Sequence, residues 1–364
     1  MRSMGLMAMT AGSFYLWLHF RSLPIFERLR IKKGMAWVLS AVLAAALLLP
    51  AALFDSVLTG FYLYLCLCYV LTDAVWFVVL LIGREKKSSR IWRRVYAGGL
   101  FAIALAGVIS VGGYFNAKSI RLTEYEIGIN KSGLSENGLR VAMISDVHLG
   151  SYLHGPDMPA LVERVNALSP DLILLCGDIY EERTTREDME RSLEAFSGFR
   201  AALGTYYVPG NHEYYAERRG ILDLSALFDD LYAAGITPLR DERVLLGGIQ
   251  LVGRDDATAS SRKPLQELLR GADMTKPVLI LDHQPLISES AESGADLQLS
   301  GHTHAGQLFP AGQLAQLTGV FPVSYGLRAY GDFSIIVSSG AGVWGFPMRV
   351  GSPSEIVLVT IKSA

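Results

Sequence analysis

The sequence of 364 residues contains only three cysteines, and their positions limit what they can do. Cys66 and Cys68 lie inside a long apolar stretch, and Cys176 is the only cysteine in the rest of the chain. The segment after residue 117 therefore cannot form an internal disulfide bond or a structural zinc site of four thiolates. The cysteines do not identify the cellular compartment.

Charged residues are also scarce, at 19% of the chain, and the formal net charge is only −2. Proteins that bind nucleic acid usually carry a strong basic excess. The charge balance thus gives no reason to expect a nucleic-acid partner. Hydrophobic residues make up 51% of the chain, and most of the excess lies in the first 117 residues.

Those first 117 residues contain several long apolar runs. A helix needs about 20 apolar residues to cross the hydrocarbon core of a bilayer. Three runs reach that length, and a weaker one at residues 4–20 carries Tyr15 and Trp17 as possible interfacial anchors. We predict a transmembrane anchor over residues 1–117 with three or four helices, at about 4–20, 35–54, 58–82 and 96–115. A signal peptide is the alternative for the first run, but no small-residue cleavage site precedes the basic loop.

The loops between the apolar runs differ in charge. Basic residues gather at 21–33 and again at 83–94, whereas the short loop after residue 54 carries only Asp55. The positive-inside rule places both basic loops in the cytoplasm. We therefore predict a multi-pass integral protein of the cell membrane whose domain after the last span is extracytoplasmic. Asp73 lies within the third run, where it either serves a function or faces a neighbouring helix.

Residues 118–137 are expected to form a linker and a lead-in strand, followed by a domain at 138–364. In that domain short apolar runs alternate with helix-like segments, which predicts an α/β domain with strands buried on both faces. The strands are expected at 139–145, 171–176, 205–209, 249–253, 277–282, 296–300, 333–339 and 355–361. The helices are expected at 156–168, 186–203, 221–234 and 264–269. In such sheets functional residues collect beyond the carboxyl ends of the strands.

Polar residues stand after five of the predicted strands, and five of the six histidines that follow the apolar region are among them. They are Asp146 and His148, then Asp178, then Asn211, His212 and Glu213, then His283, and finally His302 and His304. Glycine, asparagine and aspartate are common turn formers, so each loop alone has an ordinary explanation. Turn formation does not call for histidine, however, and the repeated pattern indicates a metal site.

Carboxylates, imidazoles and one amide suit borderline divalent ions such as Mn²⁺, Fe²⁺ or Zn²⁺. The candidate metal ligands are Asp146, His148, Asp178, Asn211, His283, His302 and His304. These are more than one ion needs, which predicts two ions about 3.5–4 Å apart with Asp178 as the bridge. His302 and His304 can face one cluster because residues i and i+2 of an extended segment point the same way. Gly301 and Gly306 would let the backbone approach closely.

The order D-x-H, G-D, G-N-H-E, H, G-H-x-H resembles the calcineurin-like metallophosphoesterases, from about Gly138 to the C-terminus. The tail at 337–361 is similar to the membrane-associated bacterial branch. The resemblance implies a four-layer α/β/β/α sandwich and a phosphodiesterase or phosphatase with two divalent metals. One metal would be bound by Asp146, His148, Asp178 and His304, and the other by Asp178, Asn211, His283 and His302. His212 would be the catalytic general acid, oriented by Asp146 as a second catalytic residue.

The resemblance implies that the substrate is a phosphoester, and the residues that would bind it are less well marked. Guanidinium groups pair with phosphate bidentately, which makes Arg349 the first candidate. The other candidates are His154, Arg183 and Arg254. Aromatic residues in glycine-rich loops at 320–327 and 343–348 predict an apolar lip facing the bilayer. An amphiphilic substrate, such as a phospholipid or a lipid-linked sugar phosphate, would fit such a site.

Two alternative functions stay open. A pyrophosphatase acting on a nucleotide-activated lipid precursor would face the cytoplasm, and it would require both basic loops to lie outside. A non-enzymatic receptor, scaffold or transport subunit would keep many histidines and carboxylates without using them. Burying such groups without partners is costly, which speaks against this second alternative.

Overall fold

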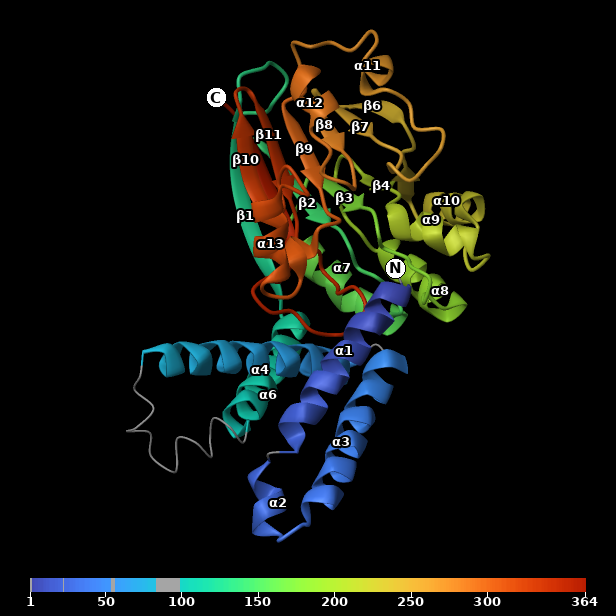
Figure 1. Cartoon of the computed structure of the whole chain (residues 1–364). Helices are drawn as coiled ribbons and strands as arrows, with labels where there is room; N and C mark the ends of the chain where they lie inside the picture. The colour runs from blue at the N-terminus through green and yellow to red at the C-terminus, as the bar shows by residue number, and fades with distance from the viewer. Residues whose placement is uncertain (1, 22, 54–55, 83–98) are drawn as a thin grey trace. The chain divides into compact units, whose positions relative to one another are not determined.

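The computed structural model describes residues 2–21, 23–53, 56–82 and 99–364 (Figure 1). The chain divides into two compact units. The first is Met1–Phe115 with Gly345–Met348, and the second is Asn116–Trp344 with Arg349–Ala364.

The first unit is helical. It contains α1 (Arg2–Phe20), α2 (Pro24–Arg28), α3 (Lys33–Leu53), α4 (Val57–Leu81) and most of α6 (Leu100–Lys118). Among the described residues, Val57–Val79 and Leu100–Lys118 have the length and apolar composition to cross a membrane, and the apolar part of α3, Lys33–Leu48, is shorter. The basic loop predicted at 83–94 lies outside the described residues.

Asp73 on α4 has partners on a neighbouring helix. Tyr15 on α1 donates a hydrogen bond of 2.5 Å to its carboxylate, and Nε2 of His19 lies 3.1 Å from the same oxygen. Of the two alternatives for this acidic side chain, the structure therefore supports the one in which it faces another helix.

The second unit contains two six-stranded sheets. The first sheet has the order β1 (Ile120–Ile129), β12 (Ser354–Ser363), β2 (Leu139–Ile144), β3 (Leu172–Cys176), β4 (Thr205–Val208) and β5 (Ile236–Pro238). The second has the order β10 (Gly326–Tyr330), β11 (Phe333–Val337), β9 (Leu297–Ser300), β8 (Val278–Leu281), β7 (Ile249–Gly253) and β6 (Glu242–Leu246). Strands β2 to β5 are parallel, and so are β7, β8, β9 and β11.

The strands alternate their side chains between two cores, as the period of two requires. Val141 and Met143 of β2 pack with Leu279 and Leu281 of β8 in a buried cluster shared by the two sheets. Ala142 and the other alternate residues of the first sheet pack against its helices. These helices are α7 (Met158–Ala167), α8 (Arg186–Phe196) and α10 (Leu224–Ala233).

A third cluster covers the other face of the second sheet. Val278 and Ile280 of β8 pack there with Leu265, the first residue of α11 (Leu265–Leu268). The remaining short elements are η2 (Gly155–Asp157), α9 (Asn211–Arg218), α12 (Ser288–Glu292), η3 (His304–Gly306) and α13 (Ala311–Thr318).

Each of the eight predicted strands is present, within two residues at either end. The helix predicted at 186–203 ends earlier, at Phe196, because Ser197 and Gly198 close a final turn. Strands β5, β6 and β10 and helices α9, α12 and α13 were not predicted. They are short, and most of them carry no clear period.

Candidate metal centre

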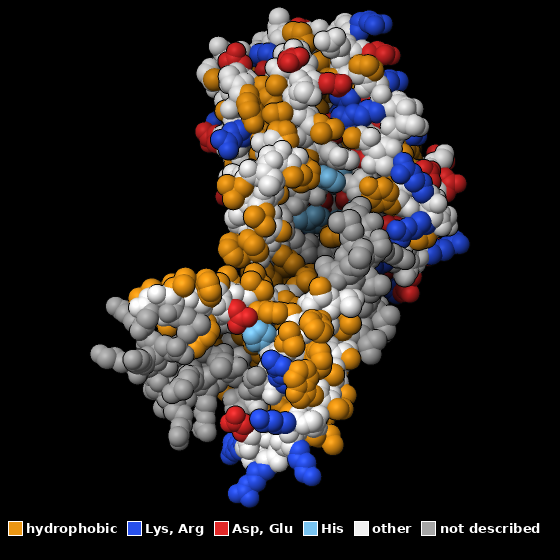
Figure 2. Space-filling view, viewed as in Figure 1, with side chains coloured by type: hydrophobic (Ala, Val, Ile, Leu, Met, Phe, Trp, Pro, Cys, Tyr) orange, Lys and Arg blue, Asp and Glu red, His pale blue; other side chains and the backbone are white. Residues whose placement is uncertain are grey.

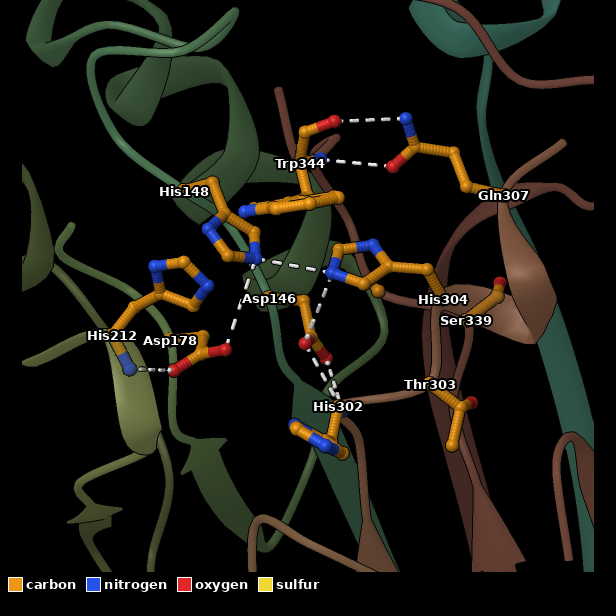
Figure 3. A network of polar contacts seen from close by, with 12 residues as sticks. Asp146, His148, Asp178, His212, His302, Thr303, His304, Gln307, Ser339 and Trp344 are labelled. Carbon is orange, nitrogen blue, oxygen red and sulfur yellow. Dashed lines mark hydrogen bonds and ion pairs between the residues drawn. The ribbon is translucent and has the colours of Figure 1, made fainter. Parts of the chain in front are cut away.

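The candidate ligands follow the ends of the parallel strands, and Figure 3 shows five of them together: Asp146, His148, Asp178, His302 and His304. Asp146 and His148 follow β2, and Asp178 follows β3. Asn211 begins α9 directly after β4, while His283 follows β8 and the pair His302 and His304 follows β9. Two groups consist only of proposed ligands, and the ligand atoms of each lie within 4.8 Å of one another. The groups are Asp146, His148 and His304, and Asp178, His283 and His302.

In the first group two imidazoles point at each other (Figure 3). Nε2 of His148 lies 3.1 Å from Nε2 of His304, and Nε2 of His304 lies 3.4 Å from Oδ1 of Asp146. Asp178 Oδ2 is 3.9 Å from His148 Nε2. His148 also turns its Nδ1 toward the Glu181 carboxylate, 3.0 Å away, which can accept that proton. The Nε2 lone pair is then free for a cation, in the arrangement typical of metal-bound histidine.

In the second group a backbone carbonyl oxygen, rather than a carboxylate, orients the histidine. His283 donates from Nδ1 to the carbonyl oxygen of Cys176 at 2.9 Å, so its Nε2 faces the site. Nε2 lies 3.0 Å from Oδ2 of Asp178, so both atoms can face the same cation. The side-chain oxygen of Asn211 is buried and has no hydrogen-bond partner among the described residues. An orphaned buried acceptor beside these groups fits a divalent ion.

The charges in the site perturb each other strongly. Burial opposes ionisation of Asp178, but His283, with His212 and His148, holds the pKa of this carboxyl well below its usual range. Burial opposes a charge on His283 as well, yet Asp178 raises its pKa well above the usual value. Burial and the neighbouring His148 lower the pKa of His304. The clustered histidines and aspartates thus fit a binuclear centre, with Asp178 close to both groups.

Five of the proposed ligands have left-handed backbone conformations. The φ angles are 50° at Asp146, 48° at His148, 51° at Asp178, 73° at His302 and 51° at His304. Asparagine, aspartate and histidine adopt this region more often than other residues do. A strained residue still costs on the order of 1–3 kcal/mol, and such residues gather at functional sites.

Close approach of the backbone depends on glycine at two positions. A Cβ atom on Gly301 would lie 2.3 Å from Oδ2 of Asp146, and one on Gly210 would lie 2.3 Å from Oδ1 of Asp178. Gly301 therefore acts as predicted. Gly306 packs closely against Gly312 instead, with a Cβ 2.1 Å from that backbone nitrogen, so it shapes the turn that follows η3 rather than the site.

His212 lies beside the first group, with its ring 4.8 Å from that of His148. Its Nδ1 is 2.8 Å from Oε2 of Glu182, and Arg219 is 3.3 Å from the other oxygen of the same carboxylate. The expectation that Asp146 orients His212 is wrong here. The Asp146 carboxylate instead accepts from the backbone N–H of His302, at 3.0 and 3.1 Å.

Glu213, the last residue of the G-N-H-E motif, ties two ligand loops together. Its buried carboxylate accepts from the backbone N–H groups of Gly210 and Asp178, and of the two residues after Asp178. Burial and the nearby Asp178 raise the pKa of Glu213, although these hydrogen bonds oppose that shift. Glu181, Glu182 and Glu213 were not assigned a role from the sequence. The adjacent acids after Asp178 were the only signal for the first two.

Three of the four candidate substrate residues lie in clearly different settings. Arg349 is fully buried, and it donates to the carbonyl oxygens of Ser339, Gly342 and His304. It therefore holds the loop of His304 from behind and offers no free donor fork to a phosphate. Burial lowers its pKa to about 10.

Arg254 is also buried, and it pairs with Asp241 at 3.2 Å and Glu289 at 2.9 Å. His154 is half exposed, and its Nδ1 lies 3.4 Å from Asp188. The geometry corrects the expectation for Arg349 and Arg254, because protein groups occupy their guanidinium donors. It leaves His154 as a surface residue outside the two ligand groups.

Trp344 is an exposed side chain close to the centre. Its ring lies 6.3 Å from that of His212, and 56% of the residue is exposed. Gln307 holds its backbone, donating from Nε2 to the carbonyl oxygen and accepting at Oε1 from the N–H, both at 2.9 Å. An indole fixed in this position can pack against a substrate that reaches His212.

Comparison with known proteins agrees with this geometry. Residues 139–306 match the family described as calcineurin-like phosphoesterase. A metallophosphoesterase of Helicobacter pylori is 35% identical over 268 residues, which cover 72% of this chain and 69% of the relative. A transmembrane protein with metallophosphoesterase domain from Danio rerio is 32% identical over 306 residues, 78% of this chain and 68% of the relative. A metallophosphoesterase of Aquifex aeolicus is 31% identical over 272 residues, 72% of this chain and 98% of the relative.

Proposed function

The chain belongs to the calcineurin-like phosphoesterase family and is a metal-dependent phosphoric ester hydrolase, and we propose that it cleaves a phosphoester at a membrane surface with two divalent ions. The observation that carries the proposal is the position of Asp178, close to histidines of both ligand groups. One ion would be held by Asp146, His148, Asp178 and His304, and the other by Asp178, Asn211, His283 and His302. Mn²⁺, Fe²⁺ and Zn²⁺ all suit these donors.

When bound, two such ions supply an activated water and neutralise charge on the phosphoryl oxygens. The side chains that face the ions have fixed directions. Glu181 and the Cys176 carbonyl orient His148 and His283, so the lone pairs of both Nε2 atoms point into the site. This preorganisation is worth more in a buried site than in water, because no side chain has to reorient during the reaction.

We assign His212 the role of general acid. Glu182 holds its Nδ1, which leaves Nε2 to carry a proton to the leaving oxygen of the ester. Asp146 then has one role, as a metal ligand. Trp344, beside the His212 ring, would pack against the leaving group.

The architecture and the location of the enzyme extend the same proposal. Two sheets with a shared core, and helices packed on both outer faces, support the four-layer α/β/β/α sandwich. The two apolar helices support a multi-pass membrane anchor at 1–117, and the basic residues of the sequence favour an extracytoplasmic catalytic domain at 138–364. A lipid-like or cell-envelope phosphoester is the substrate class that suits this location.

The test of the reaction uses the full chain and its Asp178→Asn variant. We expect metal analysis to find two divalent ions per unaltered chain. Hydrolysis of bis(4-nitrophenyl) phosphate should fall on the order of 10²–10³-fold in the variant. The exposed Asp332, in the turn between β10 and β11, provides the control Asp332→Asn. Hydrolysis that persists without metal would reject the proposal.

Topology needs a separate test. A reporter fused after Ala364 that works only outside the cytoplasm should be active. Activity of a cytoplasm-only reporter at the same position would instead support the alternative orientation, that of a pyrophosphatase of a nucleotide-activated lipid precursor.

A further inference from the structure

The segment after the last two histidine ligands presents apolar side chains to solvent. We call the residues Phe309, Leu314, Leu317 and Val320 the apolar ridge. They are 51%, 54%, 83% and 63% exposed. Helix α13, which carries the two leucines, has no buried residue. A helix that buries nothing gains no stability from a core, so its apolar residues need another explanation.

Three residues of the ridge lie at one end of α13. Leu314 and Leu317 are three residues apart and therefore share one side of α13. The helix ends at Gly319 in the left-handed conformation, and the N–H of Val320 bonds back to the carbonyl oxygen of Ala315. This ending turns Val320 back toward the last turn of the helix. Figure 2 shows hydrophobic side chains gathered over the α13 region, next to a hollow where histidine is visible.

The segment that carries the ridge lacks formal charge. No aspartate, glutamate, lysine or arginine occurs from Ala305 to Leu327, in a chain in which 19% of residues are charged. Single exposed apolar residues are normal on a protein surface. A group of them within twelve residues, without charge in between, marks a surface that leaves water on binding.

The position of the ridge indicates what covers it. Helix α6 is a candidate membrane span, and its last residues, from Asn116, belong to the second unit. Asn116 donates to the carbonyl oxygens of Arg349 at 3.1 Å and Ser352 at 2.8 Å. Val350, between these two, accepts from the N–H of Phe309 at 2.7 Å. The backbone of Phe309, the first residue of the ridge, thus bonds to the same 349–352 segment as Asn116, in the last turn of α6.

The other end of the segment contacts the metal centre. Thr303, between the two histidine ligands, donates to the carbonyl oxygen of Ser324 at 2.6 Å. The ring of Phe321 lies 5.6 Å from that of His302, edge to face. A displacement of the segment would therefore be transmitted to a ligand of the second group.

We infer that the apolar ridge docks onto a lipid surface, the bilayer in which the protein itself is anchored. The inference rests on the membrane anchoring in the proposed function. Hydrocarbon is the partner that matches a surface with exposed leucines and no charge, and the end of α6 places that surface at the boundary of the bilayer. Docking would bring the phosphate of a lipid in that bilayer to the side of the centre formed by His302.

The experiment is a depth measurement on the full chain in phospholipid nanodiscs. The three native cysteines are replaced by alanine, and one spin label is placed at Leu317→Cys. The control label is at Leu245→Cys, which replaces a leucine of similar exposure, 63%, on edge strand β6. We expect the label at 317 to collide with oxygen several-fold more often than with a water-soluble nickel complex, and the label at 245 to show the reverse.

Each other outcome overturns the inference. Equal behaviour of the two labels would mean that the ridge stays in water. A label at 317 shielded from both oxygen and nickel would mean that a protein, or a second copy of this chain, covers the ridge. Because the depth measurement needs no turnover, it tests whether the ridge enters the bilayer even if the proposed reaction is wrong.

A second measurement links the ridge to activity. In the variant with Leu314→Gln and Leu317→Gln, hydrolysis of 4-nitrophenyl hexadecyl phosphate in the nanodisc should fall at least fivefold. Hydrolysis of 4-nitrophenyl methyl phosphate, which has the same leaving group but is soluble, should stay within twofold. Leu245→Gln should change neither rate. An equal loss with both substrates, or no loss with either, contradicts a docking role. Failure of the unaltered chain to hydrolyse either ester would reject the proposed reaction alone.

Discussion

The second unit holds two buried, highly charged clusters that differ in how their charges are matched. In the ionic cluster, Arg254 pairs with Asp241 and Glu289, and Arg262 binds Asp282 with two hydrogen bonds of 3.0 and 2.6 Å. The metal centre also contains ligand atoms of equal polarity that face each other, as in the 3.1 Å approach of two imidazole nitrogens.

The backbone conformations of the two clusters also differ. Of the ionic cluster only Asp241 has a positive φ, 54°, whereas five ligands of the metal centre do. Buried charges in general perturb pKa values, in structural networks as well as in active sites. The two clusters show that the useful distinction is whether protein groups complete the charge balance. Where they do, the cluster serves the fold, and where they do not, the donor atoms are available to bind an ion.

The largest expected effect that tests this distinction is on stability. Replacing Arg254 by methionine leaves Asp241 buried without its charged partner, which should lower the free energy of unfolding by about 3–5 kcal/mol. Metal content should be unchanged in the variant that still folds. Denaturant unfolding with metal analysis checks both, and Arg270→Met, at an exposed arginine, is the control. Loss of metal in proportion to stability would show that the two clusters are not independent.

Glu182→Gln tests a carboxylate beside the metal centre, and the expected effect, on turnover, is smaller. The amide keeps the shape but loses the charge that orients His212, so turnover should fall on the order of tenfold. The loss should be greater for phenyl methyl phosphate than for 4-nitrophenyl methyl phosphate, because a poorer leaving group depends more on a proton donor. Metal content should not change.

The control for that measurement is Glu190→Gln, at a residue whose side chain is 61% exposed on α8. An equal loss with both leaving groups would mean that Glu182 only supports the loop, and would remove the argument for His212 as general acid.

The smallest expected effect is the release of a proton when metal binds. Burial lowers the pKa of His283, but Asp178 raises it well above its usual value, so the site without metal favours a proton on that imidazole. A metal ion must displace it, so binding should release about one proton from this histidine, and metal affinity should fall as the pH is lowered. Calorimetry at pH 7 in buffers of different ionisation enthalpy measures the release. In His283→Asn the released proton should disappear, and an unchanged release would contradict the assignment.

The clustering of the candidate ligands could be predicted from the sequence because each strand end is marked by residues whose chemistry stands out locally. Histidine in a turn has no conformational explanation, and the parallel strands carry all these turns to one edge. Arg349 shows why substrate-binding residues could not be predicted from the sequence. A charge in a sequence is assumed to be exposed, and only the packed structure shows a guanidinium enclosed by carbonyl oxygens.

The orienting carboxylates and the apolar ridge could not be predicted for a related reason. Glu181 and Glu182 act through the directions of their side chains, which the order of residues does not contain. Helix α13 is eight residues long, and its leucines face solvent rather than a core. Sequence patterns are interpreted on the assumption that apolar residues are buried, and that assumption does not hold here.

The left-handed backbone at five ligand positions also limits how this centre can be redesigned. A substitution there has to provide a donor atom and also tolerate a positive φ, and β-branched residues such as valine or threonine fail the second requirement. Glycine tolerates it fully but has no side chain. His302→Gly would thus remove a donor with little backbone strain, whereas His302→Val would combine both losses. Substitutions intended to exchange one metal for another are therefore largely limited to aspartate, asparagine and histidine.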